Sequence, residues 1–368
     1  MAPTPRPGIL EIAPYVGGAA RLDGVDRVAR LASNENPLGP SPDAVTAYAE
    51  LGDALHRYPD GASTALRAAL ADMYGLDAGR IVCGAGSDEV LTLLARAYAG
   101  PGDEVLYSRH GFLMYPIAAT TAGATPVAAP EHELCADVDA LLARVTPRTR
   151  VVFLANPNNP TGTYLGGAAL ARLHAGLPAD VLLVLDAAYA EYATAADYSD
   201  GAALVDKADN VVMTRTFSKI YGLAALRLGW AYGPAGVIDV LNRMRGPFNV
   251  AAPAQVAGLA AVRDQVHVHR SIEHNTRWRR WFRAEAARAG LQTLPSEGNF
   301  VLLDLGGADA AAAAEARFRD HGVLVRQMTK YGLPAHLRVT IGTEADMRQA
   351  AGALDAVAAA LDPASETL

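Results

Sequence analysis

Short, nearly continuous runs of apolar residues alternate with helical segments through most of the chain. A strand that is apolar throughout, rather than at every second position, is typical of a sheet covered by helices on both faces. Ala-rich helical segments separate the runs, which predicts an α/β fold with a mostly parallel seven-stranded sheet. The expected strands are Arg80–Cys83, Glu104–Tyr107, Thr125–Ala128, Arg150–Ala155, Val181–Leu185, Asn210–Thr214 and Leu228–Tyr232.

The two ends of the chain depart from this alternation. Residues 1–45 are rich in Pro, Gly and Asn without a sustained period, so we expect an arm that lies on other parts of the protein. A large domain is expected over residues 46–246, and a helical connection over 247–289. Residues 290–368 are predicted to form a small α+β domain with an Ala-rich helix between its first two strands. Its expected strands are Asn299–Leu303, Val323–Arg326 and Leu337–Ile341.

Composition and charge exclude several classes of protein. The 368 residues are 51% hydrophobic and 19% charged, which is enough apolar material for a sizeable core. The formal net charge of −7 gives no reason to expect a nucleic acid or an anionic membrane as partner. Membrane-spanning helices are not expected, because no apolar run approaches roughly 20 residues. Two cysteines, Cys83 and Cys135, exclude a disulfide scaffold and fit a cytoplasmic protein.

Two other segments suggest functions that the residue spacing disfavours. His267 and His269 stand two positions apart on an expected helix and therefore point in different directions, so no metal site is expected. Residues 277–283 mix arginines with aromatic residues, as in some proteins that bind single-stranded nucleic acid. Helical spacing instead places the aromatic residues on one buried stripe, which favours a structural role.

Candidate phosphate ligands follow the first expected strand. Ligands in open α/β sheets bind just past the carboxyl ends of the strands. Here the strand runs into Gly84-Ala85-Gly86-Ser87-Asp88-Glu89 and then into an apolar helix. Free amides at a helix N-terminus suit a phosphate, although the same residues also fit a tight strand-to-helix turn.

Chemically reactive side chains follow two further strands. Asp186 and Tyr189 come after one of them, and Lys219 follows the other, between Ser218 and, further on, Arg227. Most lysines are solvated surface charges. An amine at the mouth of a parallel sheet, accompanied by an acid, a tyrosine and hydroxyl groups, indicates a reactive lysine beside phosphate ligands.

The order of these motifs resembles the histidinol-phosphate aminotransferase family of fold type I pyridoxal-phosphate enzymes. The resemblance runs from about Pro14 to Gly342, and nine motifs in the same order are hard to explain by chance. The motifs begin at Ser33-Asn34-Glu35-Asn36-Pro37, Arg57-Tyr58-Pro59-Asp60, Gly84-Ala85-Gly86-Ser87-Asp88-Glu89, Asn156-Pro157-Asn158-Asn159-Pro160, Asp186-Ala187-Ala188-Tyr189, Thr216-Phe217-Ser218-Lys219, Arg245-Gly246-Pro247, Pro295-Ser296-Glu297-Gly298-Asn299 and Leu337-Arg338-Val339.

The resemblance implies pyridoxal 5′-phosphate as the cofactor and assigns roles around its ring. Lys219 matches the lysine that joins the cofactor aldehyde and moves the substrate proton. Asp186 matches the acid that keeps the pyridine nitrogen protonated. Tyr189 and Asn159 match groups that bond to the ring oxygen O3′, and Phe112 matches an aromatic residue that stacks on the ring.

The resemblance also implies how the cofactor phosphate is bound. Tyr58 is expected to reach this phosphate from the neighbouring subunit, so the family pattern implies a homodimer with shared active sites. The ligands expected from the same subunit are Gly86, Ser87, Asp88, Thr216, Ser218 and Arg227.

Substrate recognition is expected to use the small domain and the arm. Arg338 matches the arginine that binds a substrate α-carboxylate, with Asn159 assisting, while Arg326 and a partner's Tyr15 match contacts to the distal phosphate of the substrate. The implied reaction is a reversible ping-pong transamination of histidinol phosphate with 2-oxoglutarate, which yields glutamate and belongs to histidine biosynthesis. Since histidinol phosphate has no α-carboxylate and glutamate has no phosphate, one site must accept both.

One departure from the family pattern leaves the substrate range open. The family commonly has Asp-Glu-Ala-Tyr where this chain has Asp186-Ala187-Ala188-Tyr189. An aromatic-amino-acid aminotransferase or a phosphothreonine decarboxylase-like enzyme therefore stays an alternative. A binding protein without catalysis is disfavoured, because Lys219, Asp186 and Arg227 are all intact. We also expect a cis peptide bond between Asn159 and Pro160.

Overall fold

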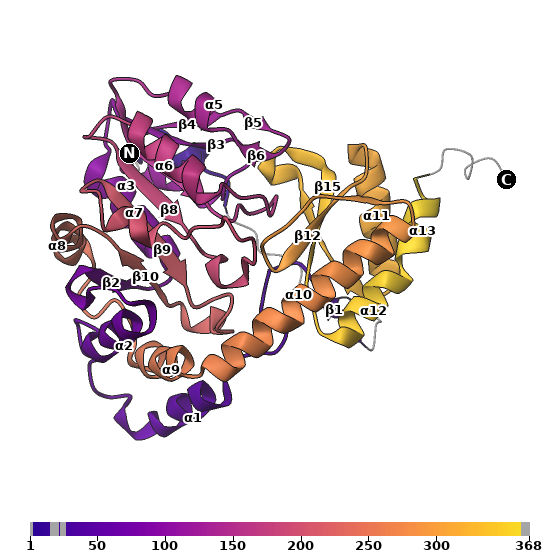
Figure 1. Cartoon of the computed structure of the whole chain (residues 1–368), viewed down its shortest axis with the longest axis horizontal. Coiled ribbons are helices and arrows are strands. Elements are labelled where there is room, and N and C mark those ends of the chain that lie inside the picture. The colour runs from indigo at the N-terminus through magenta and orange to yellow at the C-terminus, as the bar shows by residue number, and fades with distance from the viewer. Residues whose placement is uncertain (1–2, 15–21, 23–26, 362–368) are drawn as a thin grey trace.

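A seven-stranded sheet organises the larger part of the molecule (Figure 1). It is seen in a computed structural model that describes residues 3–14, 22 and 27–361. β10 is antiparallel to both of its neighbours, and the other neighbouring pairs are parallel. The strands lie in the order β2 (Ile81–Gly84), β10 (Gly229–Tyr232), β9 (Val211–Thr216), β8 (Leu182–Asp186), β7 (Thr149–Ala155), β3 (Glu104–Ser108) and β4 (Thr125–Ala129). All seven expected strands are thereby confirmed.

Helices cover both faces of this sheet and bury six of its strands, as the apolar runs predict, whereas the edge strand β4 is largely exposed. Successive residues of β7 enter opposite cores: Val152 and Leu154 join one, Val151 and Phe153 the other. The first core is covered by α1 (Pro42–Glu50), α2 (Thr64–Tyr74), α5 (Val138–Ala143), α6 (Gly167–Gly176), α7 (Ala202–Val205) and α9 (Ala252–Arg263). The second is covered by α3 (Ser87–Tyr98), α4 (Met114–Ala122) and α8 (Ala235–Met244).

A long helix, α10 (Gln265–Arg288), runs from the large sheet to a smaller sheet near the C-terminus (Figure 1). Trp278 and Phe282 of this helix are buried in a separate hydrophobic core. Three helices complete this part: α11 (Ala308–Asp320), α12 (Glu344–Gly352) and α13 (Leu354–Ala359). The four antiparallel strands of the small sheet lie in the order β11 (Gln292–Thr293), β12 (Phe300–Asp304), β15 (Leu333–Thr340) and β14 (Arg326–Met328).

The expected strand Val323–Arg326 is divided in the structure. Its first half, β13 (Val323–Leu324), leaves the small sheet and pairs in parallel with β1 (Ala29–Arg30) of the arm. Its end belongs to β14, so Arg326 lies on the small sheet. Outside both sheets, β5 (Glu131–His132) and β6 (Cys135–Ala136) form a short antiparallel pair.

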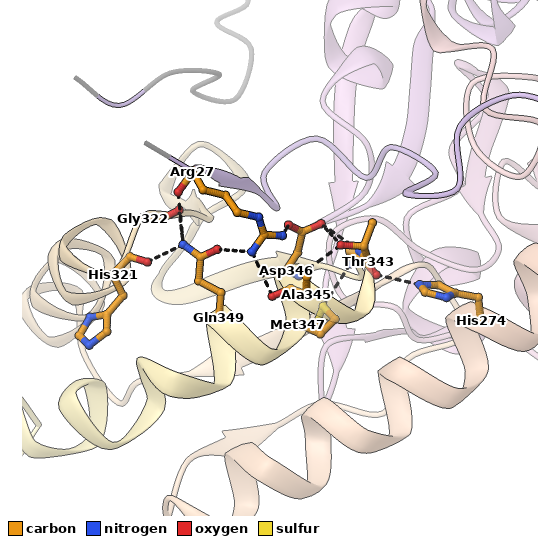
Figure 2. A network of polar contacts seen from close by, with 10 residues as sticks. Arg27, His274, His321, Gly322, Thr343, Ala345, Asp346, Met347 and Gln349 are labelled. Carbon is orange, nitrogen blue, oxygen red and sulfur yellow. Dashed lines mark hydrogen bonds and ion pairs between the residues drawn. The ribbon is translucent and has the colours of Figure 1, made fainter. Parts of the chain in front are cut away.

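Polar contacts fix the arm to helix α12, which packs beside the small sheet (Figure 2). The Arg27 guanidinium donates to Asp346 Oδ1 at 2.6 Å and to Gln349 Oε1 at 3.0 Å. Gln349 Nε2 in turn donates to the His321 carbonyl at 2.8 Å. Asp346 also closes a capping box with Thr343 at the start of α12. The arm is therefore anchored just before the residues that enter the functional site.

In the described part of the chain, no helix combines the length and the hydropathy needed to cross a bilayer.

Candidate active site

A cavity of about 410 Å³ lies beyond the carboxyl ends of β8 and β9, where the arm and the small sheet face the large sheet. This volume is within the usual range for small-molecule sites. The structure brings most of the sequence-predicted residues together around it: Ser87, Asp88, Phe112, Asn159, Asp186, Tyr189, Thr216, Ser218, Lys219, Arg227, Arg326 and Arg338. Gly86 does not line the cavity itself but lies against the Arg227 guanidinium.

One predicted residue, Tyr58, is not brought to this cavity by its own chain. Tyr58 is 84% exposed and stacks on Phe248, with the ring centroids 4.6 Å apart. It does not line the cavity of its own chain. Tyr15 lies outside the described residues.

Asp186 ends β8 and is almost fully buried. Its two carboxylate oxygens accept hydrogen bonds from Tyr115 Oη at 2.9 Å and Thr214 Oγ1 at 3.1 Å. Burial raises the pKa of Asp186 to about 6, while the bonds from Tyr115 and Thr214 oppose this rise. A buried carboxylate of this kind is suited to face a cationic nitrogen.

Lys219 lies in the turn after β9, within reach of the arm. Its Nζ donates to the Ser33 carbonyl at 3.3 Å and lies 5.9 Å from the centre of the Tyr189 ring. Burial, and then the charge of Arg338, lower the pKa of Lys219 to about 8. A larger share of this amine is therefore neutral near pH 7 than in an exposed lysine. The neutral form is the one that can act as a nucleophile or a base.

The hydroxyl of Tyr189 and the amide of Asn159 are each held by a partner from a distant segment. Asn34 of the arm donates to Tyr189 Oη at 2.9 Å. Arg338 of β15 donates to Asn159 Oδ1 at 2.5 Å and to the Ala32 carbonyl at 2.9 Å. Asn159–Pro160 is cis, as expected, and Asn156–Pro157 is cis as well.

A second group of side chains forms a cradle at the N-terminus of α3. Arg227 Nη1 donates to Ser218 Oγ at 3.2 Å, and Arg227 Nη2 donates to Asp88 Oδ2 at 3.2 Å. Gly86 has a φ of +86°, and a Cβ there would lie 2.8 Å from Arg227 Nη2. The first-turn amides of a helix have no partner within the helix. Hydroxyls, a guanidinium and these amides around a space kept open by glycine fit the phosphate of pyridoxal phosphate.

Arg326 and Arg338 occupy directly opposed positions on the antiparallel strands β14 and β15. Opposed residues project from the same face of a sheet, and like charges at such positions destabilise it. Both arginines line the cavity. An anion shared between them would offset their repulsion.

Several residues of the site were not given a role from the sequence. Ser33 and Asn34 belong to the first of the nine family motifs, but only the structure shows that Ser33 contacts Lys219 and that Asn34 contacts Tyr189. The sequence does not mark Tyr115 or Thr214 as functional. A tyrosine in an apolar helix and a threonine in a buried strand are both ordinary structural residues. Ala187, where the family commonly has glutamate, is buried in the core and does not line the cavity.

The comparisons with known proteins agree with this geometry. A family model for aminotransferase class I and II matches residues 26–354. The histidinol-phosphate aminotransferase of Rhodospirillum centenum is 61% identical over 354 residues, which cover 96% of this chain and 98% of the relative. The protein of the same name from Paramagnetospirillum magneticum is 58% identical and covers 93% of this chain and 95% of its own.

Solved structures show the same likeness. The histidinol-phosphate aminotransferase of Sinorhizobium meliloti, in complex with pyridoxal-5′-phosphate, has a TM-score of 0.91 at 31% identity and covers 98% of this chain and 99% of its own. Aspartate aminotransferase of Thermus thermophilus, at 23% identity and a TM-score of 0.79, shares the fold. The chain belongs to the class I and II aminotransferases of fold type I and, among them, to the histidinol-phosphate aminotransferases.

Proposed function

We propose that this protein transfers an amino group between histidinol phosphate and 2-oxoglutarate, with pyridoxal 5′-phosphate as its cofactor, in histidine biosynthesis. The observation that carries the proposal is one cavity that combines Lys219 and Asp186 with the opposed cations Arg326 and Arg338. When bound, the cofactor acts as an electron sink for negative charge at the substrate α-carbon. The identity of 61% to a named histidinol-phosphate aminotransferase supports this substrate over the alternatives.

The residues of the large sheet would hold the cofactor and handle the protons. Arg227, Ser218 and the amides of Ser87 and Asp88 would bind its phosphate, and the Asp88 carboxylate would orient Arg227, to which it is paired. Asp186 would hold a proton on the ring nitrogen. Lys219 Nζ would take up the proton that leaves the substrate α-carbon and return it in the reverse step, and its lowered pKa leaves a larger share of the amine neutral and able to accept that proton.

Groups around these residues would orient the ring. Tyr189 and Asn159 would form hydrogen bonds to the hydroxyl oxygen of the ring. Asn34 holds Tyr189 in place, and Arg338 holds Asn159. Phe112 lines the same cavity and would cover one face of the ring. These contacts would fix the ring plane relative to Lys219.

The two arginines of the small sheet would serve both substrates in turn. Histidinol phosphate presents one phosphate, whereas glutamate presents two carboxylates. Arg338 would take the α-carboxylate of glutamate, and Arg326 would take the distal phosphate or the distal carboxylate. The repulsion between the opposed guanidinium groups decreases whenever either anion is bound.

Substitution of Arg326 by glutamine is expected to raise KM for histidinol phosphate about 10- to 100-fold, the range for a hydrogen bond to a charged group. Steady-state kinetics with histidinol phosphate, phenylalanine and phosphothreonine as donors measures this. Arg319→Gln, on the exposed side of α11, is the matched control and should behave as wild type. Equal KM values in the Arg326→Gln and wild-type enzymes, or a wild-type preference for phenylalanine or phosphothreonine, would contradict the proposal.

We further propose that the enzyme is a homodimer in which each site is completed by its partner. Tyr58 is 84% exposed and lies next to Phe248, which is also exposed, so this aromatic pair is available to a second copy of the chain. The family resemblance assigns Tyr58 to the cofactor phosphate of the neighbouring subunit and the partner's Tyr15 to the substrate phosphate.

A mixture of Tyr58→Ala and Lys219→Ala subunits tests the shared site. In a two-fold dimer, one site of each heterodimer would combine an intact Lys219 with an intact Tyr58, so activity should reappear on mixing. Each variant alone should stay inactive or strongly impaired. Mixed dimers, separated by two affinity tags, that show no gain over the homodimers would contradict sharing.

We also propose that the chain divides as the sequence predicts, into an arm (1–45), a large domain (46–246), a helical connection (247–289) and a small domain (290–368). The separate hydrophobic core beside the small sheet supports this division. The pairing of β1 with β13 agrees with an arm that joins the small domain. A cytoplasmic location stays a prediction.

A further inference from the structure

We infer that Tyr115 is a positioning residue for the reaction: its hydroxyl donates to the Asp186 carboxylate and so keeps that carboxylate charged against the ring nitrogen of the cofactor. The inference rests on the proposed function, because it requires a pyridine ring beside Asp186. Tyr115 does not line the cavity. It acts through Asp186.

The contact joins two buried groups, one from helix α4 and one from the end of strand β8. Tyr115 lies in the first turn of α4 and is 0% exposed, and Asp186 ends β8, 71 positions later. The Tyr115 Oη to Asp186 Oδ2 distance is 2.9 Å. Thr214 donates to the other oxygen, so the negative charge is supported by two hydroxyl groups. Phenol and alcohol hydroxyls can donate without bringing a competing positive charge.

Packing fixes the direction of the Tyr115 hydroxyl. The ring stacks on Phe153 of β7, with centroids 4.9 Å apart and planes at 9°. On another side it meets Phe112 edge to face, at 6.0 Å and 89°. Phe112 is the residue proposed to cover the cofactor ring. One tyrosine therefore supports two proposed cofactor contacts, at the ring nitrogen and at the ring face.

The hydroxyl matters because a buried acid and a pyridinium can exist as an ion pair or as a neutral pair. Burial raises the pKa of Asp186, while the hydrogen bond from Tyr115 is the first of the opposing causes. In the neutral pair, the N–H bond of the ring is broken and an O–H bond forms on Asp186, so that both charges vanish. Hydrogen bonds to the charged carboxylate disfavour this transfer. Loss of the Tyr115 hydroxyl should shift the proton toward Asp186.

The substitution Tyr115→Phe removes one oxygen and keeps the ring that packs between Phe153 and Phe112. We would load wild type and variant with pyridoxal phosphate labelled with ¹⁵N in the ring and record the nitrogen signal by NMR over a pH range. The wild-type signal should report a protonated nitrogen, and the variant signal should move toward the neutral form. The kcat should fall about 10- to 100-fold, as for a hydrogen bond to a charged group, with KM for histidinol phosphate nearly unchanged.

Two further variants make the test specific. Thr214→Val removes the other donor and should move the nitrogen signal in the same direction. Tyr107→Phe changes a half-buried tyrosine whose ring lies 6.4 Å from Tyr115 and should leave signal and kcat as in wild type. A ring nitrogen that stays protonated in Tyr115→Phe as in the wild type would overturn the inference and leave the proposed function intact, whether or not Thr214→Val moves the signal. A neutral nitrogen already in the wild type would overturn it together with the role proposed for Asp186.

Discussion

Replacing Lys219 by alanine is expected to lower kcat for transamination by ~10⁴-fold or more, since one group would lose both its roles as nucleophile and as proton carrier. The amine is placed for both by its turn after β9 and by its contact with Ser33. Binding of the cofactor should persist, because the cradle formed by Arg227 and Ser218 does not involve Lys219.

The chain makes this prediction simple to check. It contains three lysines, Lys207, Lys219 and Lys330, so borohydride treatment of the cofactor-loaded enzyme followed by peptide mass analysis should label one peptide only. Lys207→Ala, at an exposed position, is the matched control and should retain labelling and activity. Normal turnover by Lys219→Ala, or a label on another lysine, would refute the assignment.

Replacing Asp186 by asparagine is expected to lower kcat by about 10²- to 10⁴-fold, because breaking a buried ion pair costs about 3–5 kcal/mol. Asparagine has nearly the same shape but no charge, so it cannot keep a proton on the ring nitrogen. Without that proton the ring withdraws fewer electrons from the substrate α-carbon. Because the substrate does not contact this side chain in the proposed site, KM should change much less than kcat.

The control for this substitution is Asp209→Asn, an exposed carboxylate just before β9. Steady-state rates and thermal unfolding of both variants separate lost chemistry from lost stability. The Asp186 variant should fold and bind the cofactor phosphate, since the cradle at α3 is intact. An unchanged kcat in Asp186→Asn would show that the ring nitrogen does not depend on this carboxylate.

The large sheet could be predicted strand by strand because its signal is local. Strands buried on both faces are apolar throughout, and all seven expected strands exist. The small sheet was harder to predict. The run Val323–Arg326 is continuous in sequence, yet its first half pairs with the arm and its last residue belongs to the small sheet. Its division depends on the arm, which pairs with β13 and has almost no strand signal of its own.

The candidate reactive groups could be predicted from the sequence, because the carboxyl ends of parallel strands meet at one edge of a sheet. Lys219 and Asp186 were therefore expected at the same edge, and the structure places the strands that precede them side by side. The contacts that hold these side chains in place are visible only in the folded protein. Asn34 and Thr340, which meet beside Tyr189, are 306 positions apart. Such contacts depend on the register of distant strands and on the path of the arm, and no local pattern of residues encodes either.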